Sequence, residues 1–415
     1  MMALPITNST STAEAVAEAQ RWIEAEVPAA WRTAAAKSPA ALRAVRSHAD
    51  YQRWYPVFAA SGLVVPTWAP EYGGLGLGNE VASAIDRVLR PLRLFRLNPL
   101  GLNNAAAALF SHGTEAQRLR FLPPIVRNDE KWCQLFSEPG AGSDLASLAT
   151  RAVRDGDSWV ISGQKVWTTW ADEADFAILL ARTDPDAPKH KGISYFLLEM
   201  HQPGVEVRPL RQITGEAEFN EVFIDNARIP DEHRVGEIND GWRVSASTLS
   251  SERQMVSGSG SGGTGRLGGS GATRLITLAQ ETGKWADPLV RNKVMRLWSQ
   301  EQIRGWTNAR VRAALSAGQS PGAASSIGKV HQATLNQQIQ DLMVDLLGID
   351  AVAWPAADDP DVLPRDVRGM LRSLANGTEG GTTDINKNIL GERVLGLPKE
   401  PDQWKGKPWK DIPRS

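Results

Sequence analysis

The spacing of apolar residues changes twice along this chain of 415 residues, and that change constrains the fold more than any single motif. Before residue 131 the apolar residues recur at helical spacing. Between residues 132 and 239 they alternate with polar residues, as in VEVRPL and FNEVFI, which predicts strands. Helical spacing then returns, most clearly over residues 288–312 and 327–347.

This order of elements predicts an α+β protein with a β layer between two helical parts. We expect an N-terminal helical domain, a middle antiparallel β domain and a C-terminal four-helix bundle, over residues 1–131, 132–239 and 240–415. In the first helix the apolar face is expected to contain Val16, Ala19 and Ile23. A low-complexity segment rich in glycine and serine, residues 257–273, is expected to link two helices.

The composition argues against several classes of protein. The formal net charge is −1, so no basic excess favours nucleic acid as a partner. Cys133 is the only cysteine and the six histidines are scattered, so neither a disulfide framework nor a metal site is expected. No apolar run approaches the ~20 residues that span a bilayer, and the first residues lack the pattern of a signal peptide. We therefore expect a cytoplasmic protein with no membrane span.

Six segments, in order along the chain, resemble the acyl-CoA dehydrogenase family over about residues 15–400. They are GLVVPTWAPEYGGLG, HGTEAQRLRFLPPI, LFSEPGAGSDLASLAT, ISGQKVWTTWADEADFAILLAR, FNEVFIDNARIP and GGTTDINKNILGERVLGLP. A single glycine-rich motif is weak, whereas six in one order are specific. The resemblance implies the three-part fold already expected, FAD as cofactor and dehydrogenation of an acyl-CoA thioester in lipid metabolism.

The resemblance also assigns residues to FAD. The glycines and proline of SEPGAGSD let a loop turn sharply and expose backbone N–H groups. Trp167 would stack on the flavin and the Thr169 hydroxyl would lie near its reactive nitrogen, where a donor stabilises arriving negative charge. The remaining contacts implied are Gln134, Leu135, Phe136, Ser137, Gly142, Thr382 and Asp384. Without the family, these segments indicate only a turn, a core tryptophan and a helix N-cap at Thr382 or Thr383.

The dehydrogenation needs a carboxylate that removes the proton next to the thioester carbonyl. In many members that glutamate directly precedes the Gly-Thr of the tail motif, but here Gly380 stands there and Glu379 lies one residue earlier. Other members keep it in a Glu-Arg pair early in the C-terminal part, which corresponds to Glu252 and Arg253 in LSSERQMV. Helical spacing places Glu252 on one face with Ser245, Leu249 and Val256.

We therefore expect Glu252 to be the base, with Ser143 and Arg253 binding the thioester or its CoA tail. The run of small residues after Val256, up to residue 263, predicts room for a branched or ring-bearing acyl group. An electron-transfer flavoprotein as electron acceptor, and assembly as a homo- or hetero-oligomeric dimer or tetramer, follow from the resemblance alone.

Two departures from the family leave alternatives open. The regions that often read Arg-x-x-Phe-Gly and Gln-x-x-Gly-Gly, and reach a neighbouring subunit's FAD, here read ETGKWADPLVRN and DLLGIDA. Arg291 is the candidate to replace the missing arginine. One alternative is therefore a subunit that needs a partner chain for FAD binding. The other is a flavin oxidase or monooxygenase of the same fold.

Overall fold

The structure is a computed structural model, and it describes residues 3–256, 271–317, 319, 322–353 and 363–413. The side chains of residues 250–256, 315–316 and 324–325 lie outside the description. The chain divides into two compact units. The first comprises Met1–Cys133, Glu173–Ile178 and Leu197–Met200, and the second Gln134–Asp172, Leu179–Phe196 and His201–Ser415.

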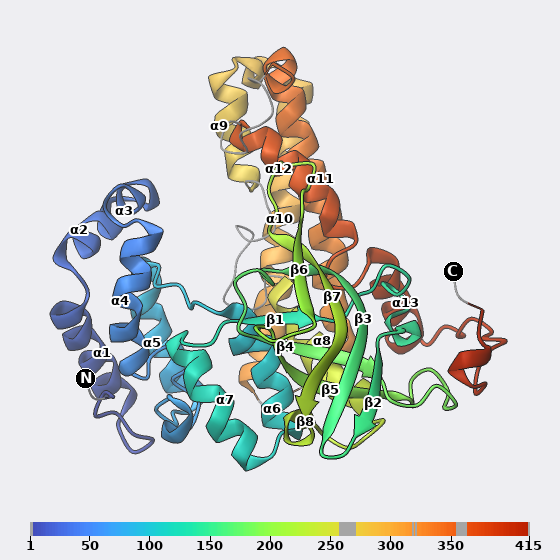
Figure 1. Cartoon of the computed structure of the whole chain (residues 1–415). Coiled ribbons are helices and arrows are strands. Elements are labelled where there is room, and N and C mark those ends of the chain that lie inside the picture. Colours follow the sequence, from blue (N-terminus) through green and yellow to red (C-terminus); the bar gives the residue numbers. More distant parts are fainter. Residues whose placement is uncertain (1–2, 257–270, 318, 320–321, 354–362, 414–415) are drawn as a thin grey trace. The chain divides into compact units, whose positions relative to one another are not determined.

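The N-terminal part is helical, as predicted (Figure 1). Three of its helices begin with a capping box, in which Ser11, Ser47 or Thr114 exchanges hydrogen bonds with the residue three positions later. The helices are α1 Thr12–Glu26, α2 Ala29–Lys37, α3 Pro39–Val45, α4 His48–Ala60, α5 Asn79–Leu89, α6 Ala106–His112 and α7 Glu115–Arg127.

The buried face of α1 differs in detail from the prediction. Ala15, Ala19 and Trp22 are buried, whereas Val16 and Ile23 are only half-buried. The reason is the aromatic packing of this part, because the Trp22 ring lies 6.0 Å from the Trp54 ring of α4 and turns the helix toward it.

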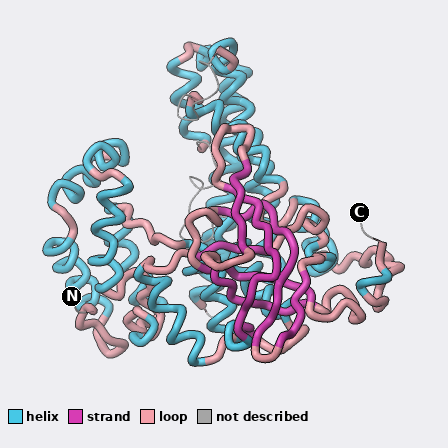
Figure 2. Tube along the Cα trace, viewed as in Figure 1, coloured by secondary structure: helices cyan, strands magenta, loops and turns pink. Residues whose placement is uncertain are grey.

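The strands form one eight-stranded sheet in the described part of the chain (Figure 2). The order is β6-β7-β3-β2-β4-β5-β8, and β1 pairs with β4. Pairing is antiparallel at β2–β3, β3–β7, β6–β7 and β5–β8, and parallel at β2–β4. The strands are β1 Trp132–Leu135, β2 Arg151–Asp155, β3 Ser158–Thr169, β4 Phe176–Arg182, β5 Ile193–Glu199, β6 Val205–Leu210, β7 Phe219–Pro230 and β8 Arg234–Val235.

The C-terminal part is helical again, with a core of its own. Leu275, Val294 and Met343, from three successive helices, are fully buried in one apolar cluster. The helices are α8 Gly241–Val256, α9 Ala272–Glu281, α10 Pro288–Ser316, α11 Ser326–Leu347, α12 Arg365–Ser373 and α13 Thr383–Arg393. Most of the predicted linker, residues 257–270, lies outside the described residues. No helix among the described residues has the length and apolarity to cross a membrane.

The predicted fold class is confirmed, since a helical N-terminal part, a middle β part and a helical C-terminal part follow one another. The alternation in β6 and β7 located the strands in the sequence, and the long helices α10 and α11 fall within the predicted C-terminal helical part.

Candidate functional site

The SEPGAGSD loop leaves β1 through a tight turn. Glu138 and Ala141 exchange backbone hydrogen bonds of 3.1 and 3.0 Å around Pro139 and Gly140. Leu135 and Phe136 are buried, Gln134 and Ser137 are half-buried, and Gly142 and Ser143 are exposed. The loop therefore starts at buried residues and exposes Gly142 and Ser143 at the surface.

A buried ion pair fixes the start of this loop. The Lys165 ammonium of β3 is fully buried and donates to Glu138 Oε1 at 2.8 Å and to the Phe136 carbonyl at 3.0 Å. The carboxylate of Glu138 also accepts from the N–H groups of Ala149 and Thr150, at 2.6 and 2.9 Å. A buried charge is tolerated only with such partners. Lys165 thereby joins β3 to the start of the loop, and the Glu138 carboxylate joins that start to residues 149 and 150.

Burial by itself raises the pKa of the Glu138 carboxyl, but the charge and hydrogen bond of Lys165, with the two backbone donors, outweigh it and lower that pKa below its usual range. Complete burial lowers the pKa of the Lys165 ammonium despite the attraction of Glu138.

The VWTTW segment contains a β-bulge. The register of β3 against β7 shifts between Lys165 and Thr168, so one extra residue stands on β3. Trp167 there has a φ of 60°, a left-handed backbone that is rare for a bulky residue. Trp167 is 61% exposed, and its ring meets the edge of the Phe219 ring at 6.1 Å between ring centres. The bulge thus turns a large aromatic face outward at a cost in backbone strain.

The two threonines after Trp167 differ in their surroundings. Thr169, at the end of β3, is half-buried beside Phe219. Thr168 is buried with its hydroxyl unpartnered in the described structure. Its neighbour in register, Asn220, donates to the Thr168 carbonyl at 3.3 Å.

The tail residues lie at the start of α13. Thr382 is the N-cap, and its hydroxyl accepts from the Ile385 N–H at 3.1 Å, as the plain helix-cap interpretation requires. Asp384 is exposed and pairs with Lys387 at 3.4 Å. An exposed pair of this kind contributes little to stability.

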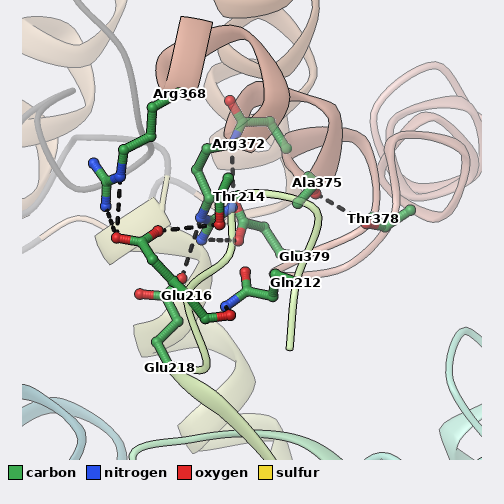
Figure 3. Close-up of polar contacts among 10 residues, drawn as sticks. Gln212, Thr214, Glu216, Glu218, Arg368, Arg372, Ala375, Thr378 and Glu379 are labelled. Atoms are coloured by element: carbon green, nitrogen blue, oxygen red, sulfur yellow. Dashed lines mark hydrogen bonds and ion pairs between the residues drawn. The ribbon is translucent and has the colours of Figure 1, made fainter. Parts of the chain in front are cut away.

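Glu379, the carboxylate one residue before the usual position of the base, is engaged by two neighbours. It accepts from Arg372 at 2.9 Å and from the Asn376 amide at 2.7 Å. Arg372 of α12 also donates to Glu218 at 3.2 Å, in the segment between β6 and β7 (Figure 3). The neighbouring Arg368 contacts Glu216 in the same segment. These contacts join α12 and the residues that follow it to the segment between β6 and β7.

The structure describes less of the other predicted residues. Glu252 and Arg253 fall within α8, but their side chains lie outside the described residues, as does the run of small residues after Val256. The guanidinium of Arg291 donates to the carbonyls of Trp285 and Ala286, at 2.8 and 2.9 Å, within its own segment.

Comparison with known proteins identifies the family. Models of the N-terminal, middle and C-terminal domains of acyl-CoA dehydrogenases match residues 13–129, 133–227 and 239–395. The chain is 38% identical to the acyl-CoA dehydrogenase IpdE1 of Mycobacterium tuberculosis, over 86% of this chain and 91% of the relative. The chain therefore belongs to the acyl-CoA dehydrogenase family, whose members are oxidoreductases that use FAD.

Two further similar proteins are a longer relative and a solved structure. The chain is 39% identical to the acyl-CoA dehydrogenase FadE34 of Mycobacterium tuberculosis over 82% of this chain, yet it spans only 45% of that relative's length. The solved structure "Tcur3481-Tcur3483 steroid ACAD" is similar with a TM-score of 0.72 and 27% identity, over 94% of this chain and 98% of that one.

The described residues fit an FAD site in this region. The indole of Trp167 is largely exposed on a strained bulge, and a flat ring stacked on this exposed face would fit its placement. Gly142 has open space around its Cα, which leaves the exposed half of the loop free to contact a ligand. The roles of the individual residues toward FAD remain predictions.

Glu138 and Lys165 were not predicted as site residues, although both stand inside motifs that resemble the family. A signal was present, because Lys165 stands in the strand-forming segment WVISGQKVW, a buried lysine needs a carboxylate, and SEPGAGSD supplies one. Their pairing over 27 positions could not be read from spacing.

We predict that Lys165→Met destabilises the protein by roughly 3 kcal/mol, because it leaves the Glu138 carboxylate buried without its cation. The measurement is the free energy of unfolding in urea. Lys131→Met is the matched control, since Lys131 is 37% exposed and its pair with Glu173 lies at the surface. Equal stability of the two variants would contradict the prediction.

The lowered pKa of Glu138 predicts a dependence on pH. The stabilisation by its ionised form is fully present above the ordinary glutamate value of 4.5 and is lost as the pH falls through the lower folded value. The difference in unfolding free energy between the wild type and Glu138→Gln should therefore shrink below pH 4.5. A difference that stays constant from pH 7 to pH 3 would show that the carboxylate is not held ionised.

Proposed function

We propose that this protein catalyses α,β-dehydrogenation of an acyl-CoA thioester to the trans-2-enoyl thioester, with Glu252 as the base. Glu252 removes the proton on the carbon next to the thioester carbonyl. FAD, when bound, accepts the hydride that leaves the β carbon. Trp167 would stack on the flavin ring, and the Thr169 hydroxyl would supply a donor where negative charge arrives.

The choice of Glu252 over Glu379 rests on one observation: the Glu379 carboxylate already accepts hydrogen bonds from two other side chains. Both oxygens of the Glu379 carboxylate are engaged, Oε2 by Arg372 and Oε1 by Asn376, so proton abstraction by Glu379 would disturb an ion pair and a hydrogen bond. A general base needs a free lone pair within reach of the substrate. Glu379 therefore suits the anchoring of the tail better than proton abstraction.

The surroundings of α8 support Glu252 instead. Ser245 and Thr248 are fully buried on α8, and Thr248 lies 3.1 Å from the buried Tyr195 hydroxyl of β5. Position 252 follows Thr248 by four residues and Ser245 by seven, so helical spacing places it on the same row. The position of Glu252 in the sequence, on the helical row of two buried residues, supports it as the candidate base.

We infer a branched or ring-bearing acyl group. The solved structure with 27% identity is named a "steroid ACAD", which supports a bulky substrate for this chain. The run of small residues that follows Val256 in the sequence supports the same choice. Re-oxidation by an electron-transfer flavoprotein is part of the proposal and follows from the family alone.

A second candidate is a subunit of a hetero-oligomer that needs a partner chain to complete FAD binding. The specific observation is in the sequence, where the regions of two segments that reach a neighbouring subunit's FAD in the family read ETGKWADPLVRN and DLLGIDA. The name of the similar solved structure also joins two designations, Tcur3481 and Tcur3483. The missing Arg-x-x-Phe-Gly and Gln-x-x-Gly-Gly segments agree with a partner that supplies these contacts.

The test of the base compares Glu252→Gln with Glu379→Gln, each purified with FAD. Ring-bearing and straight-chain acyl-CoA thioesters are added without oxygen, and the rate at which the flavin absorbance bleaches is measured. We expect Glu252→Gln to slow bleaching by about 10²- to 10⁴-fold, the range for loss of a general base. Glu379→Gln should bleach at a rate close to that of the wild type.

The reverse result would move the base to the tail and reject Glu252. A wild-type chain that is purified without flavin, and gains it only with a second homologous chain, would favour the hetero-oligomer. Faster bleaching by straight short-chain thioesters than by ring-bearing ones would reject the bulky substrate.

A further inference from the structure

The last part of the chain extends beyond the family match, which ends at residue 395, and packs on the loop between β4 and β5. The backbone N–H of Trp409 donates to the Ala187 carbonyl at 2.9 Å, and that of Lys410 donates to the Pro185 carbonyl at 3.1 Å. Lys410 also forms an ion pair with Asp186. In Figure 1 this segment is the red stretch before the C-terminus. We call residues 404–412 the C-terminal strap.

Trp409 is the buried residue of the strap, with 8% of its surface exposed. Its ring lies 4.4 Å from the guanidinium of Arg182, at the end of β4. Its indole N–H donates to the Ser147 carbonyl at 3.2 Å. A buried indole with its N–H satisfied and a cation on its face is a specific contact, which a loosely attached tail would not form.

Trp409 and Arg182 together hold three successive carbonyl groups. Arg182 donates to the carbonyls of Ala146 and Leu148, at 2.6 and 3.1 Å, on either side of the Ser147 carbonyl that Trp409 takes. Arg182 is itself buried, with 3% exposed. The backbone of this stretch cannot shift without breaking several buried hydrogen bonds.

This stretch directly follows the exposed half of the SEPGAGSD loop. The Ser147 hydroxyl donates to Asp144 at 2.5 Å, and Lys189 of the loop under the strap donates to Asp144 at 2.8 Å. Asp144 is the neighbour of Ser143, the residue proposed to contact the thioester or the CoA tail. The strap is thus linked to Ser143 through Ser147 and Asp144.

We propose that Trp409 is a positioning residue for acyl-CoA binding, which fixes residues 143–148 from outside the family's common fold. The part of this inference that concerns the substrate rests on the proposed function of Ser143. The part that concerns the backbone of residues 143–148 does not. If the strap only stabilised the protein as a whole, its buried Trp409 would not need to contact residues 146–148 in particular.

The experiment uses the full-length, FAD-loaded protein in three variants. Trp409→Ala removes the ring and the donor. Trp409→Phe keeps a ring over Arg182 but cannot donate to Ser147. Trp404→Ala is the matched control, because Trp404 lies in the same strap and its ring contacts the Lys407 ammonium at 4.6 Å.

Two readouts separate the two parts of the inference. Amide hydrogen exchange, followed by mass spectrometry, reports the backbone of residues 143–148. Calorimetric titration with coenzyme A itself reports the binding site. In Trp409→Ala we expect faster exchange in this stretch and about fivefold weaker CoA binding, the size of one lost buried hydrogen bond. Trp409→Phe should lie between Trp409→Ala and the wild type, and Trp404→Ala should match the wild type in both.

Unchanged exchange at residues 143–148 in Trp409→Ala would overturn the positioning role, whatever happens to CoA. Faster exchange with unchanged CoA affinity would overturn the link to the substrate while leaving the proposed dehydrogenation intact. If the wild type binds no CoA at all, the proposed function fails, and the exchange experiment still decides what the strap does to the backbone.

Discussion

The buried pair of Lys165 and Glu138 is the contact on which the described part of the site depends. It joins the middle of the sheet to the loop that leaves β1, and it reaches that loop through a carbonyl, a carboxylate and two backbone N–H groups. Two charges taken from water in this way are costly, so the pair is stable only while every partner stays in place. The position of the SEPGAGSD loop is therefore tied to the position of β3.

That loop is anchored at both ends and exposed in its middle. Lys165 holds its beginning at Phe136 and Glu138, and Arg182 holds its end at Ala146 and Leu148. Between these anchors Gly142, Ser143 and Asp144 are exposed, whereas Ala141 is buried. A binding loop of this design loses little conformational entropy when a ligand arrives, because its ends are fixed before binding. The bulge at Trp167 follows Lys165 by two residues, so the aromatic face and the loop share one anchor.

Much of this arrangement could be predicted from the sequence, and the reasons for the rest are specific. The strands β6 and β7 show their alternation directly. The bulge could not be predicted, because WTTW reads as a continuous strand and only the pairing with β7 shows the extra residue. The buried face of α1 was displaced by one position because the size of Trp22 outweighed the apolar character of Val16 and Ile23. The surroundings of Glu252 lie outside the described residues.

The backbone of the tail also bears on where the chemistry takes place. Gly380 and Gly381 have φ values of 62° and 81°, a left-handed conformation that disfavours residues with side chains. A glutamate at position 380 would carry this strain, and Glu379 beside it is held by Arg372 and Asn376. Arg372 in turn holds Glu218 next to β7. In our proposal the tail therefore anchors the helices to the sheet, and the reactive carboxylate belongs to α8, whose helical backbone carries position 252 without strain.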